Sequence, residues 1–130
     1  MTETNARILI VDDERTTRLM LNKGLQKEGY EIEEAVDGEE ALGKMKEFDP
    51  HVILLDVMMP GVTGDELIGT LKELQPRVEV IMVTAIEKEE ILAECRRKGA
   101  FGVISKPVNF GDLRTRIKEA LEHRRKQAAE

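Results

Sequence analysis

The feature that most constrains the fold is a run of four apolar residues that ends at an acid. The run Val52–Leu55 has no polar residue on either face, which is typical of a central parallel strand covered on both sides. Asp56 follows it directly, Pro60-Gly61 then predicts a turn, and Gly64 allows the loop to pack closely. A buried acid is costly unless a cation meets it. The run therefore predicts a parallel sheet with a functional carboxylate at its edge.

A second all-apolar run has the same form. Residues 8–11 are Ile-Leu-Ile-Val and lead directly into Asp12 and Asp13. Residues 30–36 predict a more polar strand, whose composition suits the edge of a sheet. The three remaining predicted strands cover residues 30–36, 78–83 and 101–105.

Helical spacing of apolar residues separates these strands. Asp37 and Thr63 each precede a glutamate three residues on, the form of a helix N-cap, and Asn109 is expected to cap the last helix. Two apolar stripes are expected to face the sheet: Leu67, Ile68, Leu71 and Leu74 in one helix, and Ile91, Leu92 and Cys95 in the next. The predicted helices cover residues 15–27, 37–48, 63–74, 87–98 and 109 onward.

Strands that alternate with helices predict an α/β fold with a doubly wound five-stranded parallel sheet and five helices. The 130 residues fit one domain, 1–130, with a core at about 7–121 and a polar, solvated tail at 122–130.

Charge and cysteine content exclude several classes of function. The net charge is −6, so we expect no direct binding to nucleic acid and none to an anionic membrane. Cys95 is the single cysteine and no secretory or membrane-spanning pattern is visible, so a cytoplasmic location is expected. His51 and His123 lack a second ligand at metal-binding spacing, and Cys95 is expected to be a core residue.

Five polar residues follow four of the predicted strands: Asp12, Asp13, Asp56, Thr84 and Lys106. Because parallel strands end at one edge of the sheet, where ligands bind, we expect these side chains to lie together. Three carboxylates and one lysine sum to −2, a charge that one Mg²⁺ neutralises, and oxygen ligands suit Mg²⁺ better than zinc. An Asp56 oxygen could then attack a phosphoryl group held by Thr84 and Lys106.

These motifs resemble the receiver domain of two-component response regulators, in particular the chemotaxis-regulator type. They are the Asp12-Asp13 pair, Asp56 followed by Met58-Met59-Pro60-Gly61, and the strand ends Thr84-Ala85 and Lys106-Pro107. The resemblance covers about residues 7–121. It implies a flavodoxin-like strand order, 2-1-3-4-5, and a cis bond before Pro107.

The resemblance also implies roles. Asp56 would accept phosphate from a phosphohistidine on a sensor histidine kinase or phosphotransfer protein. Mg²⁺ would be bound by Asp12, Asp13, Asp56 and the Met58 carbonyl, while Thr84 and Lys106 would contact the phosphate. The chain would catalyse only its own phosphorylation and dephosphorylation, and so would not be an enzyme acting on other substrates.

The chain departs from the family pattern near the expected signalling surface. Val103 stands where many receivers carry an aromatic residue that rotates inward, so we expect a loop movement around Thr84-Ala85 to carry the signal instead. The surface would be formed by the predicted helices 87–98 and 109 onward with the strand 101–105. Met58 and Ile86 are apolar where some relatives carry polar residues that position water, which predicts slow self-dephosphorylation.

Rival functions fit the residues less well. A phosphatase of the haloacid-dehalogenase type needs a second acid two residues after its nucleophile, where this chain has Met58. A flavin or nucleotide binder needs a Gly, Ser or Thr-rich phosphate loop where Asp12-Asp13-Glu14 stands. The intact site positions disfavour a receiver that serves only as a docking module. A downstream protein target, a missing output domain and a phosphorylation-dependent dimer all stay open.

Overall fold

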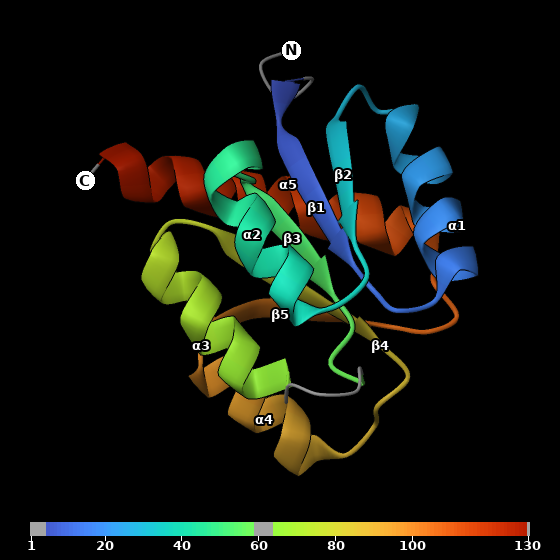
Figure 1. The fold of residues 1–130 in the computed structure, drawn as a ribbon, viewed down its shortest axis with the longest axis vertical. Helices are drawn as coiled ribbons and strands as arrows, with labels where there is room; N and C mark the ends of the chain where they lie inside the picture. The colour runs from blue at the N-terminus through green and yellow to red at the C-terminus, as the bar shows by residue number, and fades with distance from the viewer. Residues whose placement is uncertain (1–4, 59–63, 130) are drawn as a thin grey trace.

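The computed structural model describes residues 5–58 and 64–129. A five-stranded parallel sheet in the order β2-β1-β3-β4-β5 lies at the centre of the molecule (Figure 1). This confirms the doubly wound α/β fold that the sequence predicts and the strand order that the family resemblance implies. The strands are β1 (Arg7–Val11), β2 (Glu31–Ala35), β3 (Val52–Leu55), β4 (Glu79–Thr84) and β5 (Ala100–Ser105).

The most apolar strand is also the central one. β3 pairs with β1 on one side and β4 on the other, so that Leu55 lies opposite both Val11 and Met82. All four β3 residues are buried because helices cover both faces of the sheet. β2 lies at the edge and alternates exposed with partly buried positions, which agrees with its polar composition.

The helices divide between the two faces of the sheet (Figure 1). α1 and α5 contribute their apolar residues to one cluster, and α2, α3 and α4 contribute theirs to the other. The alternation of the strand side chains separates the clusters, since Ile53 and Leu55 belong to one and Val52 and Leu54 to the other. The helices are α1 (Arg15–Gln26), α2 (Gly38–Phe48), α3 (Gly64–Leu74), α4 (Glu89–Arg97) and α5 (Phe110–Ala129).

Several helix ends form as the sequence predicts. The Asp37 carboxylate accepts a hydrogen bond from the Glu40 N–H at the start of α2 (2.9 Å), and the Asn109 side chain accepts one from the Asp112 N–H in α5 (3.0 Å). Gly29 and Gly99 follow α1 and α4 with φ of 87° and 118°, values that glycine adopts without steric cost. The predicted turn at Pro60-Gly61 and the cap at Thr63 lie outside the described residues.

Two predictions about core positions are wrong. Leu74 is 58% exposed because it is the last residue of α3, where it borders a surface hollow shared with Leu42 and Met45 of α2. Ile91 is 38% exposed because the short helix α4 buries only Leu92 and Cys95. The buried position of Cys95 is confirmed.

The predicted polar tail forms the end of the last helix. α5 continues through it to Ala129, beyond the expected core limit at residue 121. His123 in this extension contacts the carboxylate of Glu79, a β4 residue that is only 2% exposed, and its ring lies 5.3 Å from that of Phe101. The extension is therefore anchored to the sheet.

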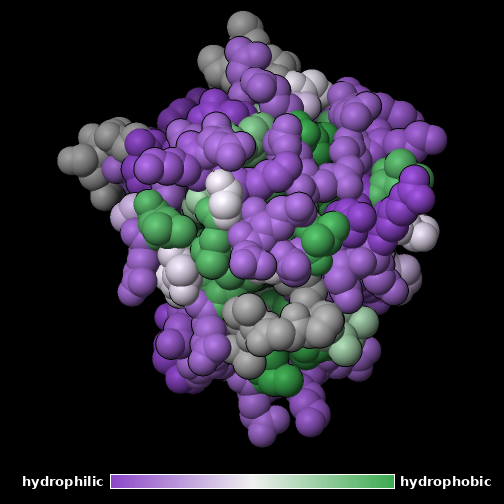
Figure 2. Space-filling model, in the orientation of Figure 1, coloured by the Kyte–Doolittle hydropathy of each residue, from purple (hydrophilic) through white to green (hydrophobic). Residues whose placement is uncertain are grey.

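The surface is mainly hydrophilic on the face in view, with apolar residues in small separate patches (Figure 2). In the described part of the chain, no helix combines the length and the apolar character needed to cross a membrane.

Candidate functional site

Three of the predicted site residues meet at the carboxyl edge of the sheet. The Lys106 ammonium nitrogen lies 2.8 Å from Asp56 Oδ2 and 3.0 Å from Asp12 Oδ2. These residues follow β5, β3 and β1, and the sheet order alone brings them together. The expected clustering of strand ends is confirmed for these three side chains.

The backbone fixes the Asp12 carboxylate. The Asp12 N–H donates to the Ala35 carbonyl at the end of β2 (3.2 Å), and Asp12 Oδ1 accepts from the Glu14 N–H (2.9 Å). Asp12 is 2% exposed, and this burial raises its pKa against the opposing effects of the Glu14 hydrogen bond and Lys106. The Glu14 hydrogen bond and the Lys106 ammonium therefore both favour the ionised carboxylate against the effect of burial.

Asp56 is held in the same way. Its N–H donates to the Val11 carbonyl (3.0 Å), and its Oδ1 accepts from the Met58 N–H (2.9 Å). The carboxylate is 6% exposed. Gly64 supports this position, since a Cβ at Gly64 would lie 2.3 Å from the Cβ of Val57, the residue next to Asp56. The close packing that the sequence predicts for Gly64 is confirmed.

Lys106 is a stable cation in this setting. Burial lowers its pKa, but the hydrogen bonds and charges of Asp56 and Asp12 outweigh burial, so the pKa lies above its usual value. The peptide bond between Lys106 and Pro107 is cis, as the family resemblance implies. The Lys106 N–H also donates to the Thr84 carbonyl (3.0 Å), which joins the ends of β4 and β5.

Thr84, Asp13 and Met58 border this cluster without joining it. The Thr84 side chain is fully buried, and its hydroxyl oxygen accepts a hydrogen bond from the Ile86 N–H (3.3 Å). Asp13 is exposed and makes no hydrogen bond or ion pair with the other described residues. The Met58 side chain is 57% exposed.

Two further residues of the site were missed from the sequence. Glu14 Oε1 lies 4.0 Å from the Lys106 nitrogen, although the sequence alone presents it as one more acid after the first strand. The Arg18 guanidinium donates to the Asp12 carbonyl (2.8 Å) and to Glu34 Oε1 in β2 (3.1 Å). An arginine near the start of a surface helix gives no sequence signal that distinguishes it from a solvated charge.

The negative charge of this cluster exceeds its positive charge, which favours the binding of a further cation. Two buried carboxylates share one ammonium, and the carboxylate of Glu14 adds further negative charge nearby. Among the described residues, no three His, Cys, Asp or Glu side chains form a metal-binding group by themselves. Mg²⁺ usually keeps several water ligands and needs only one or two protein carboxylates, so Asp12 and Asp56 are a donor set that fits it.

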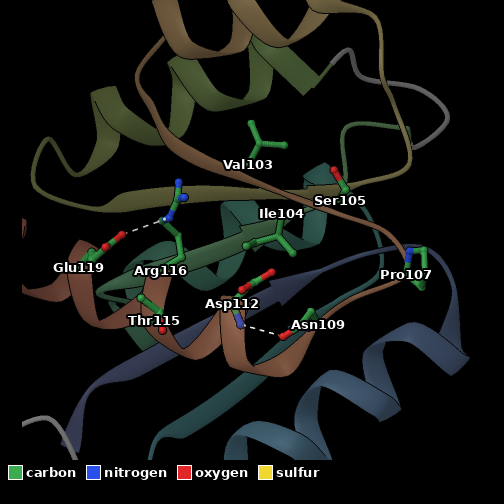
Figure 3. Close-up of a pocket in the computed structure, with 9 residues that line it drawn as sticks. All are labelled: Val103, Ile104, Ser105, Pro107, Asn109, Asp112, Thr115, Arg116 and Glu119. Carbon is green, nitrogen blue, oxygen red and sulfur yellow. Dashed lines mark hydrogen bonds and ion pairs between the residues drawn. The ribbon is translucent and has the colours of Figure 1, made fainter.

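A second feature lies beside the site, on the outer side of β5. Residues of β5 and α5 line a hollow of about 450 Å³, shown in Figure 3. The Arg116 side chain crosses this hollow beside Gly102 and pairs with Glu119 (3.2 Å). Val103 and Ile104 point to opposite faces of the sheet, and Pro107 lies just beyond the end of β5.

The model of the response regulator receiver domain family matches residues 8–118 of this chain. The chain belongs to that family. This receiver domain is 33% identical over 117 residues to sporulation initiation phosphotransferase F of Bacillus subtilis, a match that covers 90% of this chain and 94% of the relative. It is 38% identical over 117 residues to a cyclic di-GMP phosphodiesterase of Thermotoga maritima.

Solved structures agree with the family assignment. The CheY-like receiver domain protein from Methanospirillum hungatei JF-1 superposes with a TM-score of 0.90 at 36% identity, covering 95% of this chain and 98% of that one. Chemotaxis protein CheY4 of Vibrio cholerae has a TM-score of 0.85 at 34% identity, covering 90% of this chain and 99% of that one.

The relatives differ in length. The match spans nearly all of the Bacillus phosphotransferase, but only 31% of the Thermotoga phosphodiesterase and 26% of regulatory protein AtoC of Escherichia coli. Similar receiver domains thus make up nearly the whole of one relative and only part of the others.

Proposed function

We propose that this receiver domain accepts a phosphoryl group on Asp56 from a phosphohistidine of a sensor histidine kinase or a phosphotransfer protein. The observation that carries the proposal is the Lys106 ammonium, held between the Asp56 and Asp12 carboxylates at 2.8 and 3.0 Å. The similarity to a phosphotransferase of Bacillus subtilis supports the same chemistry.

The transfer needs a nucleophile, a leaving group and positive charge. An Asp56 oxygen attacks phosphorus, the P–N bond of the phosphohistidine breaks, and the donor nitrogen keeps its electron pair. The Lys106 ammonium is near enough to Asp56 to bind a phosphoryl oxygen of the product, an acyl phosphate. The Thr84 hydroxyl lies at the end of the adjacent strand β4 and is the proposed second donor.

The proposed cofactor is Mg²⁺, bound by Asp12, Asp13, Asp56 and the Met58 carbonyl. When bound, it supplies positive charge that stabilises the phosphoryl oxygens in the transition state. The buried carboxylates of Asp12 and Asp56 support this assignment, because together they exceed the single positive charge of Lys106.

The phosphoryl group is accepted and lost at this chain's own site and is not transferred to a further substrate. We propose that the domain catalyses its own phosphorylation and dephosphorylation in the cytoplasm and has no other substrate. Met58 and Ile86 offer no polar side chain to position an attacking water, so the acyl phosphate should last for minutes or longer. A half-life of seconds, measured by intact mass after removal of the donor, would contradict this part of the proposal.

The signal would leave through the face formed by α4, β5 and α5. The hydrogen bond from the Lys106 N–H to the Thr84 carbonyl supports this route, because it ties the site to the end of β5. Val103 is half-buried against the core and lacks an aromatic ring, so a movement of the loop after Thr84 is the proposed switch. The output is a downstream protein, a further domain or a second copy of this chain.

The face can be tested with a phosphoryl mimic. Backbone chemical shifts recorded with and without beryllofluoride and Mg²⁺ should change at residues 84–88 and along α4, β5 and α5. The same titration of Asp56→Asn should leave them unchanged. Shifts confined to the residues around Asp56 would reject the proposed signalling face while leaving the phosphorylation chemistry intact.

The decisive test of the function is covalent. The chain is incubated with acetyl phosphate and Mg²⁺, and its intact mass is measured with and without hydroxylamine, which cleaves acyl phosphates. Wild type should gain one phosphoryl group that hydroxylamine removes, and Asp56→Asn should gain none. Asp37→Asn replaces an exposed helix-capping acid and should react as wild type does.

A further inference from the structure

Arg18 connects the acidic loop of the site to the edge strand of the sheet. Its Nη1 donates to the Asp12 carbonyl at 2.8 Å, and its Nε donates to Glu34 Oε1 in β2 at 3.1 Å. The arginine side chain is only 13% exposed, so these contacts are made largely out of water. One rigid guanidinium therefore joins the backbone after β1 to a side chain of β2.

Glu34 is itself fixed by a second residue of α1. The Asn22 side-chain amide donates to Glu34 Oε2 at 2.6 Å, so both carboxylate oxygens have a donor from the same helix. Asn22 lies one turn after Arg18, and both side chains face β2. The carboxylate is therefore a fixed anchor for the arginine and not a mobile surface acid.

The loop that this network holds carries the site carboxylates. The Asp12 carbonyl belongs to the peptide unit that leads into Asp13, and Asp12 Oδ1 accepts from the Glu14 N–H. The exposed Asp13 has no hydrogen bond or ion pair to other described residues that would fix its own side chain. The position from which the Asp13 side chain extends is therefore set by the backbone alone, and the Asp12 carbonyl is where Arg18 restrains that backbone.

We propose that Arg18 and Glu34 are positioning residues that hold the Asp12-Asp13 backbone in the geometry needed to bind Mg²⁺. This inference rests on the proposed function. Glu34 neutralises the charge of Arg18, so that a cation can lie next to an acidic site without repelling the metal ion. The arginine thus has a structural effect on Mg²⁺ affinity that is opposite in sign to its electrostatic effect.

The charge of Arg18 and its effect on the loop predict opposite changes in Mg²⁺ affinity, so a mutation distinguishes them. If Arg18 acted only through its charge, Arg18→Met would remove a nearby positive charge and tighten Mg²⁺ binding. If it positions the loop, Arg18→Met should weaken binding by about tenfold, as for other residues that orient metal ligands. Arg18→Lys keeps the charge but loses the planar fork, and should also weaken binding. Glu34→Gln should also weaken Mg²⁺ binding, but by less than Arg18→Met does.

Arg15→Met is the matched control. Arg15 lies on the same helix at the same end of the sheet, and it is exposed. It makes no hydrogen bond or ion pair with the other described residues, so its replacement removes an equal charge without loosening the loop. Mg²⁺ affinity, measured by calorimetry, should be unchanged or slightly tighter in this variant.

A second readout needs no metal. The Glu14 N–H donates to Asp12 Oδ1, so its hydrogen exchange reports on the loop in metal-free protein. Exchange should be about tenfold faster in Arg18→Met than in Arg15→Met. Exchange at Ile53 and Ile81, in the buried centre of the sheet, should be equal in both variants, which separates a loosened loop from a destabilised fold.

The outcomes distinguish this inference from the proposed function. Weaker Mg²⁺ binding with faster Glu14 exchange only in the Arg18 and Glu34 variants supports both. Unchanged or tighter binding in Arg18→Met, with wild-type exchange at Glu14, overturns the positioning role alone. A wild-type chain that does not bind Mg²⁺ overturns the proposed function and this inference together.

Discussion

The Lys106 ammonium lies 2.8 Å from Asp56 Oδ2, although 50 positions separate the two residues in the chain. Their meeting follows from the order of the strands, since β3 and β5 both pair with β4 and end at the same edge of the sheet. The ammonium therefore already contacts the carboxylate that we propose as the phosphoryl acceptor. Asp12 completes the arrangement from β1 on the other side of β3.

Removing the ammonium should slow phosphorylation of Asp56. Lys106→Met keeps much of the length of the side chain but leaves no cation for the phosphoryl oxygens, and the loss of one such donor slows a reaction by about 100-fold. The rate of adduct formation with acetyl phosphate, followed by intact mass, measures the effect. Lys23→Met removes an exposed lysine from α1 and should react at the wild-type rate. Equal rates in both variants would rule out the proposed role of Lys106.

Gly64→Ala should disturb the site through packing. The new Cβ would lie 2.3 Å from the Cβ and 2.8 Å from the Cα of Val57, so the backbone next to Asp56 must move. We expect a loss of about 1–3 kcal/mol in the free energy of unfolding, together with slower phosphorylation. Gly43→Ala is the control, because its Cβ would meet nothing within 4 Å, and it should stabilise α2 by up to about 1 kcal/mol. Wild-type stability and rate in Gly64→Ala would contradict the packing shown by the structure.

His51 should make the fold less stable in acid. Burial, and then the charges of Arg124 and Arg7, lower the pKa of His51 to about 4, and its Nδ1 accepts a hydrogen bond from the Arg7 N–H (2.9 Å). The unfolded chain binds a proton near the ordinary pKa of 6.5, whereas the folded chain does not until about pH 4. The contribution of neutral His51 to the free energy of unfolding is therefore fully present above about pH 6.5 and is lost as the pH decreases towards 4.

Urea unfolding at pH 7 and pH 4.5 measures this effect. His51→Gln should lose about 2 kcal/mol less stability than wild type between the two values, because the glutamine does not titrate. Subtracting one pH profile from the other removes the effect of aspartate and glutamate titration on stability, because this effect is common to both proteins. Parallel pH profiles for the two proteins would show that His51 is not held neutral by the fold.

His123 should stabilise the fold through Glu79. The Glu79 carboxylate is buried in β4, and its contact with His123 of α5 is the hydrogen bond that the structure gives it. His123→Ala should therefore cost about 1–3 kcal/mol in the free energy of unfolding, because it removes a hydrogen-bond partner of a buried acid. Lys126→Ala changes an exposed residue one turn along and should cost little. If His123→Ala cost no more than Lys126→Ala, the extension of α5 would contribute nothing through this contact.

Patterns of apolar residues were enough to predict the sheet. The runs at 8–11 and 52–55 are apolar on both faces, and a strand of this kind fits only between two layers of helices. The reach of each helix was harder to predict, because burial at its end depends on the neighbouring element. Leu74 continues the α3 stripe, but the structure leaves it at the rim of a surface hollow.

Some charged residues of functional or structural importance could be predicted from the sequence, and others could not. Asp12, Asp56 and Lys106 could be predicted because each follows a strand that the apolar pattern locates. Arg18 and Glu79 could not, since a charge within a helix or strand carries no mark of the partner that the fold brings to it. Their partners Glu34 and His123 lie 16 and 44 positions away, on elements whose contact depends on the complete sheet.

The most direct measurement of the central claim locates the phosphoryl group. Borohydride reduces an aspartyl phosphate to homoserine, so the phosphorylated chain is reduced, digested and mapped by mass spectrometry. We predict homoserine at position 56 only, in amounts that depend on Mg²⁺ and are much smaller in Lys106→Met after the same time. Homoserine at position 12 or 13, or none at all after treatment with acetyl phosphate and Mg²⁺, would contradict the assignment of Asp56 as the phosphoryl acceptor.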